Sequence, residues 1–220
     1  MRPRSGSGRL ASWLPRTSSD GPASWFKRPG SKIDQVDDHL FHGSSDAPTC
    51  PDPMIRNNIT AVVSIVNRMD DKWEEVTRKF IPASQHLIVE WPEERPMGVL
   101  EHMEDICDFI DLRLGVITSM KPHDAIAAAR GFGPRARGNV LVHSNLDPSF
   151  SKLVLMAYMM RRDDLKVEQV LSQMRTKIRV QPNLTVERIL RMWRSLRFEV
   201  WKDMNRLEFS DHFKHQMWME

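Results

Sequence analysis

The chain of 220 residues has little cysteine: Cys50 and Cys107 are the only two. Two cysteines cannot build a disulfide framework or a zinc site, so the sequence predicts a protein of a reducing compartment, the cytoplasm or the nucleus. The longest apolar run, residues 153–160, is far shorter than the roughly 20 residues of a membrane helix. We therefore expect no membrane span, no metal and no cofactor.

An excess of charge of one sign is also missing, because 32 Lys and Arg stand against 29 Asp and Glu. A dedicated nucleic-acid binder carries a stronger basic bias, so this balance disfavours nucleic acid as a partner and an RNA-associated function. Hydrophobic residues make up 40% of the chain. That share suffices for the core of one globular domain with tails.

The composition changes along the chain and predicts its organisation. Residues 1–31 hold six Lys and Arg against one acid among many Gly, Ser and Pro, which is typical of a disordered basic tail. A mitochondrial transit peptide is the alternative, although four prolines would break its helix. We place one domain at residues 32–208, with a flexible insertion at 121–137, and a C-terminal tail at 209–220.

Hydrophobic periodicity predicts an α/β fold with a central mixed sheet flanked by helices. Uninterrupted β-branched runs, above all ITAVVSIV, are typical of strands covered on both faces. We expect strands at 39–43, 59–66, 85–90 and 138–144. Helical segments are expected at 54–58, 99–112, 150–161 and 165–174, and a last helix begins near Asn183 or Thr185 and runs past residue 200.

One segment, residues 140–152, joins a buried strand to a buried helix through a short loop. Backbone N–H groups at such a helix start can hold a phosphate-sized anion. The segment VLVHSNLDPSFSK resembles the signature loop of the dual-specificity, cysteine-based protein phosphatases. In that family the strand ends in Val-His-Cys, five residues follow, and an Arg precedes the helical Ser.

Other segments resemble the same family in matching order over residues 33–197. HLFHGS is similar to its first strand and turn, ITAVVSIVN to its second strand, and HLIVEWPEERP to the strand that leads into the acid loop. ICDFID and LVLMAYMMRR are similar to the helices before and after the signature, and IRVQPN to the closing segment. The resemblance implies a dual-specificity-phosphatase-like domain, similar to the serine/threonine/tyrosine-interacting proteins.

The resemblance fails where the family's chemistry lies. It places Ser144 at the nucleophile, Phe150 at the phosphate-binding Arg, and Trp91 near the general acid, with Glu90, Glu93 or Glu94 as stand-ins. A serine lacks the low pKa of the family's thiolate, and phenylalanine offers no donor to phosphate. The degenerate phosphate loop comprises His143, Ser144, Asn145, Leu146, Asp147, Pro148, Ser149 and Phe150.

Four residues in or next to this loop have further implications. Asp147 replaces a family glycine and puts a carboxylate where a dianion would bind, and Pro148 removes one backbone N–H. His143 is the family histidine that supports the loop. Lys152 is either a compensating charge or an ordinary solvated lysine.

The combined losses predict a pseudophosphatase: a domain without catalytic residues that acts as a protein-interaction or phosphosignalling scaffold. The expected partner is a protein, either a phosphoprotein or a member of an active phosphatase or kinase pathway. The alternative is an active tyrosine or serine/threonine phosphatase that uses a non-standard loop through Ser144.

Overall fold

The structure is a computed structural model that describes residues 32–68, 71–91, 96–116, 138–181 and 183–200. The segments predicted as tails and insertion (1–31, 121–137 and 209–220) lie outside the described residues. In the part of the chain that is described, no helix is long and apolar enough to cross a membrane.

A five-stranded sheet with the order β1-β2-β5-β3-β4 forms the centre of the molecule. β1 pairs antiparallel with β2, and the other neighbours pair in parallel, so the sheet is mixed as predicted. The inner strands β5 and β3 are buried almost throughout, because a parallel sheet of this kind is covered on both faces. The strands are β1 (Ile33–Asp37), β2 (Leu40–Gly43), β3 (Ile59–Val66), β4 (His86–Glu90) and β5 (Asn139–Ser144).

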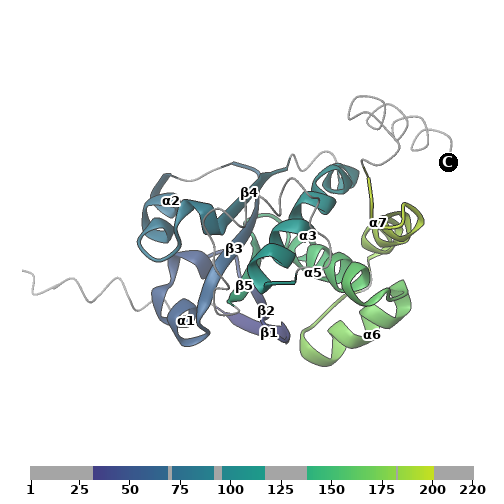
Figure 1. Ribbon diagram of the computed structural model, residues 1–220, viewed down its shortest axis with the longest axis horizontal. Coiled ribbons are helices and arrows are strands. Elements are labelled where there is room, and N and C mark those ends of the chain that lie inside the picture. Colours follow the sequence, from purple (N-terminus) through teal and green to yellow (C-terminus); the bar gives the residue numbers. More distant parts are fainter. Residues whose placement is uncertain (1–31, 69–70, 92–95, 117–137, 182, 201–220) are drawn as a thin grey trace, which may run out of the picture.

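Helices cover both faces of the sheet (Figure 1). On one side lie α1 (Pro51–Arg56) and α2 (Asp71–Arg78), and on the other lie α3 (Leu100–Leu114), α5 (Pro148–Asp163), α6 (Val167–Lys177) and α7 (Leu184–Ser195). Short 3-10 turns (Ala47–Thr49, Ala83–Gln85 and Pro96–Val99) complete the described elements. The predicted α/β class is therefore confirmed.

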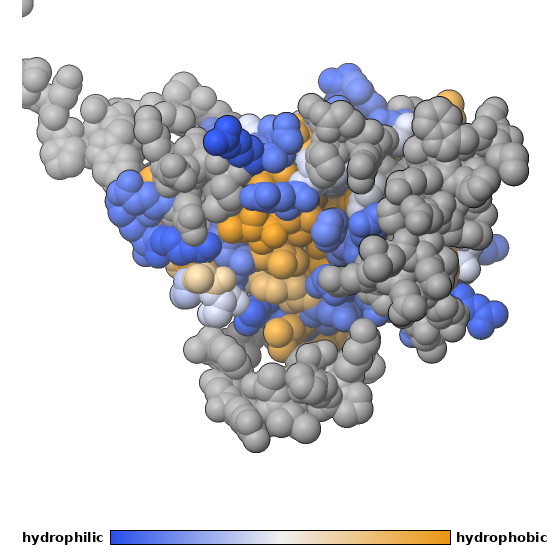
Figure 2. Space-filling view, turned by 90° about the horizontal axis from the view of Figure 1, so that it is seen from above, coloured by the Kyte–Doolittle hydropathy of each residue, from blue (hydrophilic) through white to orange (hydrophobic). Residues whose placement is uncertain are grey.

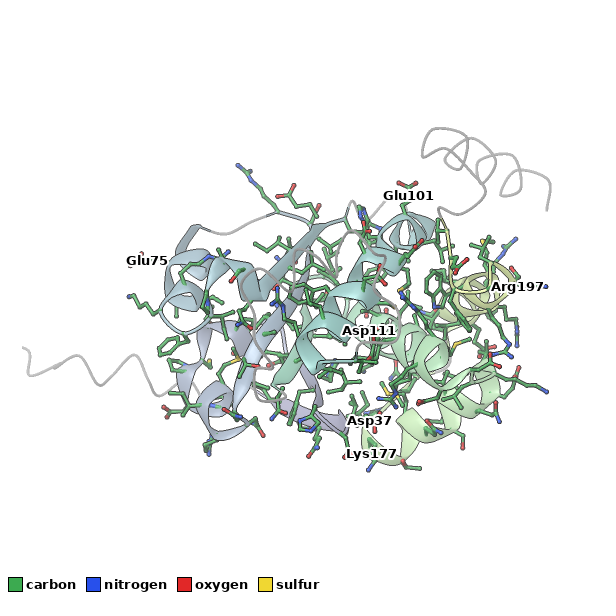
Figure 3. The ribbon with its side chains drawn as sticks, in the orientation of Figure 1. Asp37, Glu75, Glu101, Asp111, Lys177 and Arg197 are labelled. Atoms are coloured by element: carbon green, nitrogen blue, oxygen red, sulfur yellow. The ribbon has the colours of Figure 1, made fainter. Side chains whose placement is uncertain are left out.

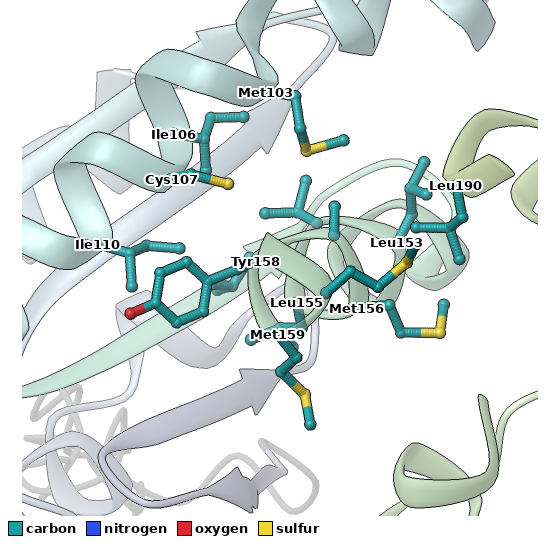
Figure 4. Packing of buried hydrophobic residues seen from close by; sticks show 14 of the residues in the cluster. Met103, Ile106, Cys107, Ile110, Leu153, Leu155, Met156, Tyr158, Met159 and Leu190 are labelled. Atoms are coloured by element: carbon teal, nitrogen blue, oxygen red, sulfur yellow. The ribbon is translucent and has the colours of Figure 1, made fainter. Parts of the chain in front are cut away.

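The larger core lies between the sheet and the helices α3, α5 and α7, and α5 is its centre. The eight residues Leu153–Met160 of α5 are all buried, so their methionines fill core space and form no binding surface. In Figure 4 the Tyr158 ring of α5 lies beside Cys107 and Ile110 of α3. A smaller cluster on the other face includes Phe41, Met54, Val62, Ile81 and Leu141.

Polar contacts tie α5 to its neighbours inside this core. The Tyr158 hydroxyl of α5 donates to Oδ1 of Asp111 at 2.9 Å, and Asp111 belongs to α3 (Figure 3). Burial raises the pKa of the Asp111 carboxyl, while this hydrogen bond and the Arg161 charge oppose the rise. The indole N–H of Trp193 on α7 donates to the Ala157 carbonyl at 3.1 Å. These bonds satisfy the buried polar atoms they join and fix how the helices pack.

The structure corrects the prediction of one long C-terminal helix past residue 200. α7 ends at Ser195, and Arg197 and Phe198 have left-handed φ angles of 54° and 64°. The turn brings the Phe198 ring to 5.7 Å from Trp193, edge to face. Glu104 of α3 then accepts a hydrogen bond from the Val200 N–H at 3.0 Å. Although the apolar spacing continues past Ser195, ring packing and the hydrogen bond to α3 hold these residues outside a helix.

Two elements have no counterpart among the sequence predictions, β1 and α2. β1 has the sequence IDQVD, with one residue fully buried, and α2 has the sequence DKWEEVTR. Both are short and contain few apolar residues, so neither forms a long apolar pattern. As a consequence, the strand predicted at 39–43 is the second of the sheet and not the first.

Candidate functional site

The candidate site lies where β5 meets α5. β5 ends at Ser144, three residues form the loop, and α5 begins at Pro148. Ser144 thus lies at the C-terminal end of the strand, as predicted. β5 pairs in parallel on both sides, with β2 and β3, and ligands of α/β proteins bind beyond this end of such strands.

Local hydrogen bonds already occupy the Ser144 side chain and the loop backbone. The Ser144 side chain is almost fully buried, and its Oγ accepts a bond from the Leu146 N–H at 3.1 Å. The Asn145 N–H donates to the Ile65 carbonyl at 3.2 Å, and the Asn145 amide oxygen accepts from the Asn67 N–H at 3.3 Å. These bonds hold the loop against the end of β3.

His143 lies in a buried polar network on the opposite side of β5. Its Nε2 and the Nε2 of His86 each share a 2.7 Å hydrogen bond with Oγ of Ser64. Arg78 contacts the other ring nitrogen of His86 at 3.0 Å. Burial lowers the pKa of His143 to about 3 and that of His86 to about 4, so both imidazoles are neutral near pH 7.

The position of His143 excludes it as a base for its neighbour. Successive strand residues point to opposite faces, so the side chains of His143 and Ser144 diverge. The described contacts of His143 lead to β3 and β4, away from the Ser144 hydroxyl. His143 therefore connects three strands of the sheet.

Asp147 has a structural role that the sequence analysis did not assign to it. Its carboxylate is the N-cap of α5 and accepts a hydrogen bond from the Ser149 N–H at 2.7 Å. Pro148 follows at the first helical position, where a missing N–H costs little. The carboxylate is exposed at the helix start and takes up an amide that an anion would otherwise use.

This capping role has a measurable consequence. Replacing Asp147 by Ala is expected to lower the free energy of unfolding by about 1 kcal/mol, since the Ser149 amide loses its acceptor. Asn183→Ala is the matched control, because Asn183 caps α7 through the Thr185 and Val186 N–H groups. Urea unfolding of both variants checks the expectation. A stabilised Asp147→Ala protein would instead mean that the carboxylate acts mainly by repulsion.

Two aromatic rings meet at the positions that the family resemblance gives to the Arg and the general acid. The rings of Trp91 and Phe150 lie 4.3 Å apart between centroids, tilted by 53°. Trp91 is 1% exposed, and its backbone N–H donates to the Val66 carbonyl at 2.8 Å. Phe150 packs against the larger core. The sequence shows an aromatic residue at each position, but nothing in it indicates that the two rings touch across 59 residues.

The remaining predicted site residues are not gathered around Ser144. Glu90 is exposed at the end of the edge strand β4, and Glu93 and Glu94 lie outside the described residues. The Lys152 ammonium donates to the Arg179 carbonyl at 2.9 Å, at the segment after α6. The bond is exposed, and both roles considered for Lys152, the compensating charge and the solvated lysine, stay predictions. Burial, together with the positive charge of Lys152, lowers the pKa of His42 to about 4.

Neither cysteine supplies a substitute nucleophile at the loop. Cys107 is fully buried in α3, where desolvation raises the pKa of its thiol to about 12. Cys50 precedes α1, beside the smaller core cluster. No group of three or more His, Cys, Asp and Glu side chains within the described ranges could hold a metal ion.

Comparison with solved structures places this architecture among known folds. A phosphatase of Cydia pomonella, PTP-2, superposes with a TM-score of 0.55 at 18% identity, covering 73% of this chain and 89% of that one. Human DUSP28 gives a TM-score of 0.54 at 20% identity, with coverages of 76% and 95%. The chain has the fold of the dual-specificity phosphatases.

A third similar structure carries that fold under a different name. The human tyrosine phosphatase-like serine/threonine/tyrosine-interacting protein gives a TM-score of 0.54 at 15% identity, covering 76% of this chain and 98% of that chain. No protein-family model matches the sequence, and no curated protein sequence matches it. At these identities the dual-specificity phosphatase fold is shared, while activity depends on the residues of the loop.

Proposed function

We propose that this chain is a pseudophosphatase: a dual-specificity-phosphatase-like domain that has lost catalysis and acts by binding a protein partner. The observation that carries the proposal is the contact between Trp91 and Phe150. Two apolar rings stand where the resemblance expects a guanidinium for the phosphoryl oxygens and a carboxyl for the leaving group. The phenyl ring of Phe150 has no hydrogen-bond donor for phosphate at the Arg position, and the indole of Trp91 cannot transfer a proton to a leaving group.

The nucleophile position supports the same proposal. A serine hydroxyl needs a general base to attack phosphorus at neutral pH. The Ser144 Oγ has a backbone N–H as its described partner, and His143, the nearest imidazole in sequence, points to the other face. Ser144 therefore lacks both the thiolate chemistry of the family and the activated hydroxyl of a serine hydrolase.

The loop is also poorly built to hold an anion. A charge-assisted hydrogen bond contributes roughly 1.5–3 kcal/mol, so loss of a bidentate Arg costs about 3–6 kcal/mol. That amounts to about a hundredfold to ten-thousandfold in affinity. Pro148 removes a further donor, and the Asp147 carboxylate already occupies the Ser149 amide. We infer that phosphate binding is lost together with catalysis.

The fold is intact, and internal hydrogen bonds occupy polar groups of the loop. A protein-binding role is the function that such a domain can still have. The partner we propose is a phosphoprotein or a component of an active phosphatase or kinase pathway. One of the similar structures is of a protein named for interaction, which supports this class of function by analogy alone. Two unpaired cysteines fit a reducing compartment, so we place this role in the cytoplasm or nucleus.

The proposal is tested by assaying the purified full chain with an aryl phosphate. We expect no turnover above a buffer blank, and no heat of binding when orthovanadate is titrated by calorimetry. Ser144→Ala is the matched control, since it removes the hydroxyl and keeps the fold. Turnover that vanadate inhibits and Ser144→Ala abolishes would overturn the proposal and establish an active phosphatase that uses Ser144.

A further inference from the structure

The edge strand β4 leaves one side of its backbone unpaired within the described residues, where it pairs with β3 alone. The Trp91 N–H donates to the Val66 carbonyl of β3. Because backbone groups alternate along a strand, Val89 also faces β3, whereas the N–H and C=O groups of Ile88 and Glu90 face outward. An unpaired edge of this kind can pair with another chain.

A groove of about 500 Å³ runs beside this edge, between β4 and the first half of α3. Apolar and acidic side chains share its lining, which consists of Leu87, Ile88, Val89, Glu90, His102, Asp105 and Ile106. Figure 2 shows apolar residues exposed in a strip between hydrophilic borders on the β4 side of the molecule. Such a surface suits the side chains of an extended segment whose backbone pairs with the strand.

The charged groups at the groove are acidic. Glu90 ends β4, Asp105 lies on α3, and Glu101 precedes Asp105 by one helical turn. Figure 3 shows Glu101 at the outer edge of the molecule, directed away from the core. Among the described residues, no lysine or arginine lines the groove. A second copy of this chain paired strand to strand would bring like charges together, whereas a basic segment would meet opposite ones.

We propose that β4 and this groove bind an extended segment of a partner protein, one with alternating apolar side chains flanked by Lys or Arg. The segment adds a strand to the sheet at β4 and places its apolar residues against Leu87 and Ile88, the partly exposed apolar residues of the lining. Its basic residues lie near Glu90 and Glu101. This inference rests on the proposed function, because it names the surface by which the domain recognises a protein.

The test uses a fluorescent ten-residue probe of alternating Val and Thr, with two Arg at each end, and measures polarisation against the full chain. We expect saturable binding that weakens at least about tenfold in Ile88→Pro. The Ile88 N–H faces outward, so a proline there removes an edge donor and spares the pairing with β3. Ile88→Thr keeps this donor and a β-branched side chain, and is expected to bind within about threefold of wild type.

Variants of the acidic residues test the proposal independently if Ile88→Pro disturbs folding. Glu90→Lys combined with Glu101→Lys is expected to weaken the Arg-flanked probe about tenfold and to favour a Glu-flanked probe of the same core. Glu168→Lys, on the distant helix α6, is the matched control and should leave binding unchanged.

Several results would overturn the inference: no binding of the probe, equal binding by all variants, or a wild-type dimer that Ile88→Pro dissociates in sedimentation. Binding only after removal of residues 1–31 would also overturn it, because that basic segment would then be the occupant. Failure of the proposed function would be seen in a different experiment, as aryl phosphate turnover that vanadate inhibits.

Discussion

Ser144→Cys is expected to show no turnover of an aryl phosphate above the wild-type background. A restored thiol would still face the Asp147 carboxylate and a loop without the Pro148 amide. It would also lack a guanidinium, since Phe150 packs against Trp91 at the position that the family gives to Arg. Supplying the nucleophile alone therefore leaves the transition-state charge unbalanced.

Stepwise repair of the loop should bring activity back in order. Ser144→Cys with Phe150→Arg is expected to give weak turnover, because the Arg supplies roughly 1.5–3 kcal/mol for each charge-assisted bond. Adding Asp147→Gly and Pro148→Ala should raise it further, by removing the anion and restoring an amide donor. Glycine is tolerated as an N-cap at a cost of a few tenths of a kcal/mol, so α5 survives the change.

Steady-state assays on this series, with vanadate binding measured by calorimetry, give the readout. Phe150→Arg alone is the matched control, because it changes the same aromatic contact without adding a thiol. Robust turnover by Ser144→Cys alone would contradict the inference that the anion site itself is lost.

The second large effect concerns acid. The free energy of unfolding is expected to fall steeply between pH 6.5 and 5, where ordinary carboxylates titrate little. Burial lowers the pKa values of His42 and His86 to about 4 and that of His143 to about 3, below the usual 6.5. In this window the histidines of the unfolded chain are protonated and those of the folded chain are not. The free energy of unfolding therefore rises with pH and falls as the pH falls. Each histidine accounts for about 2 kcal/mol at pH 5.

The geometry explains why these imidazoles stay neutral. Ser64 Oγ lies 2.7 Å from both His143 and His86, with its single proton available to one of them. Protonation of both rings would place an N–H donor on each side of the hydroxyl and leave its proton without an imidazole acceptor. The positive charge of Arg78 beside His86 makes protonation of His86 still less favourable.

Urea unfolding at pH 8, 6.5, 5.5 and 5 measures this dependence. His143→Asn should reduce the proton uptake on unfolding by about one. Asp111 changes the free energy of unfolding in the opposite direction. Burial raises its pKa, so the folded chain binds this proton more tightly than the unfolded chain, and the resulting stabilisation is lost as the pH rises. Asp111→Asn should therefore steepen the loss of stability toward acid. A free energy of unfolding that is flat from pH 7 to 5 would contradict the expectation.

Much of the fold could be predicted from local patterns. The run ITAVVSIV forms β3, the strand before Ser144 forms β5, and the apolar spacing of residues 99–112 marks α3. Side-chain periodicity is a property of neighbouring residues, so the sequence displays it directly. β1 and α2 were not predicted, because each is short and contains few apolar residues.

The Phe198 turn shows where local patterns fail. Apolar spacing continues past Ser195, yet the chain turns there so that Phe198 packs on Trp193 and Val200 bonds to Glu104. The free energy of these contacts depends on α3 and on the Trp193 ring, and continued helical spacing does not encode it. A helix boundary decided by tertiary packing cannot be predicted from periodicity alone.

The sequence by itself determined the chemical inventory of the loop: a hydroxyl at 144, a proline at 148 and an aromatic ring at 150. Only the tertiary structure decided what these groups do, because each partner comes from a distant part of the chain. Trp91 reaches Phe150 across 59 positions, and Ser64 joins His86 to His143 across two strand boundaries. Asp147 is also a helix cap, since the folded loop aims its oxygen at the Ser149 amide. Residue types fix which interactions are available, and burial and geometry select which of them form.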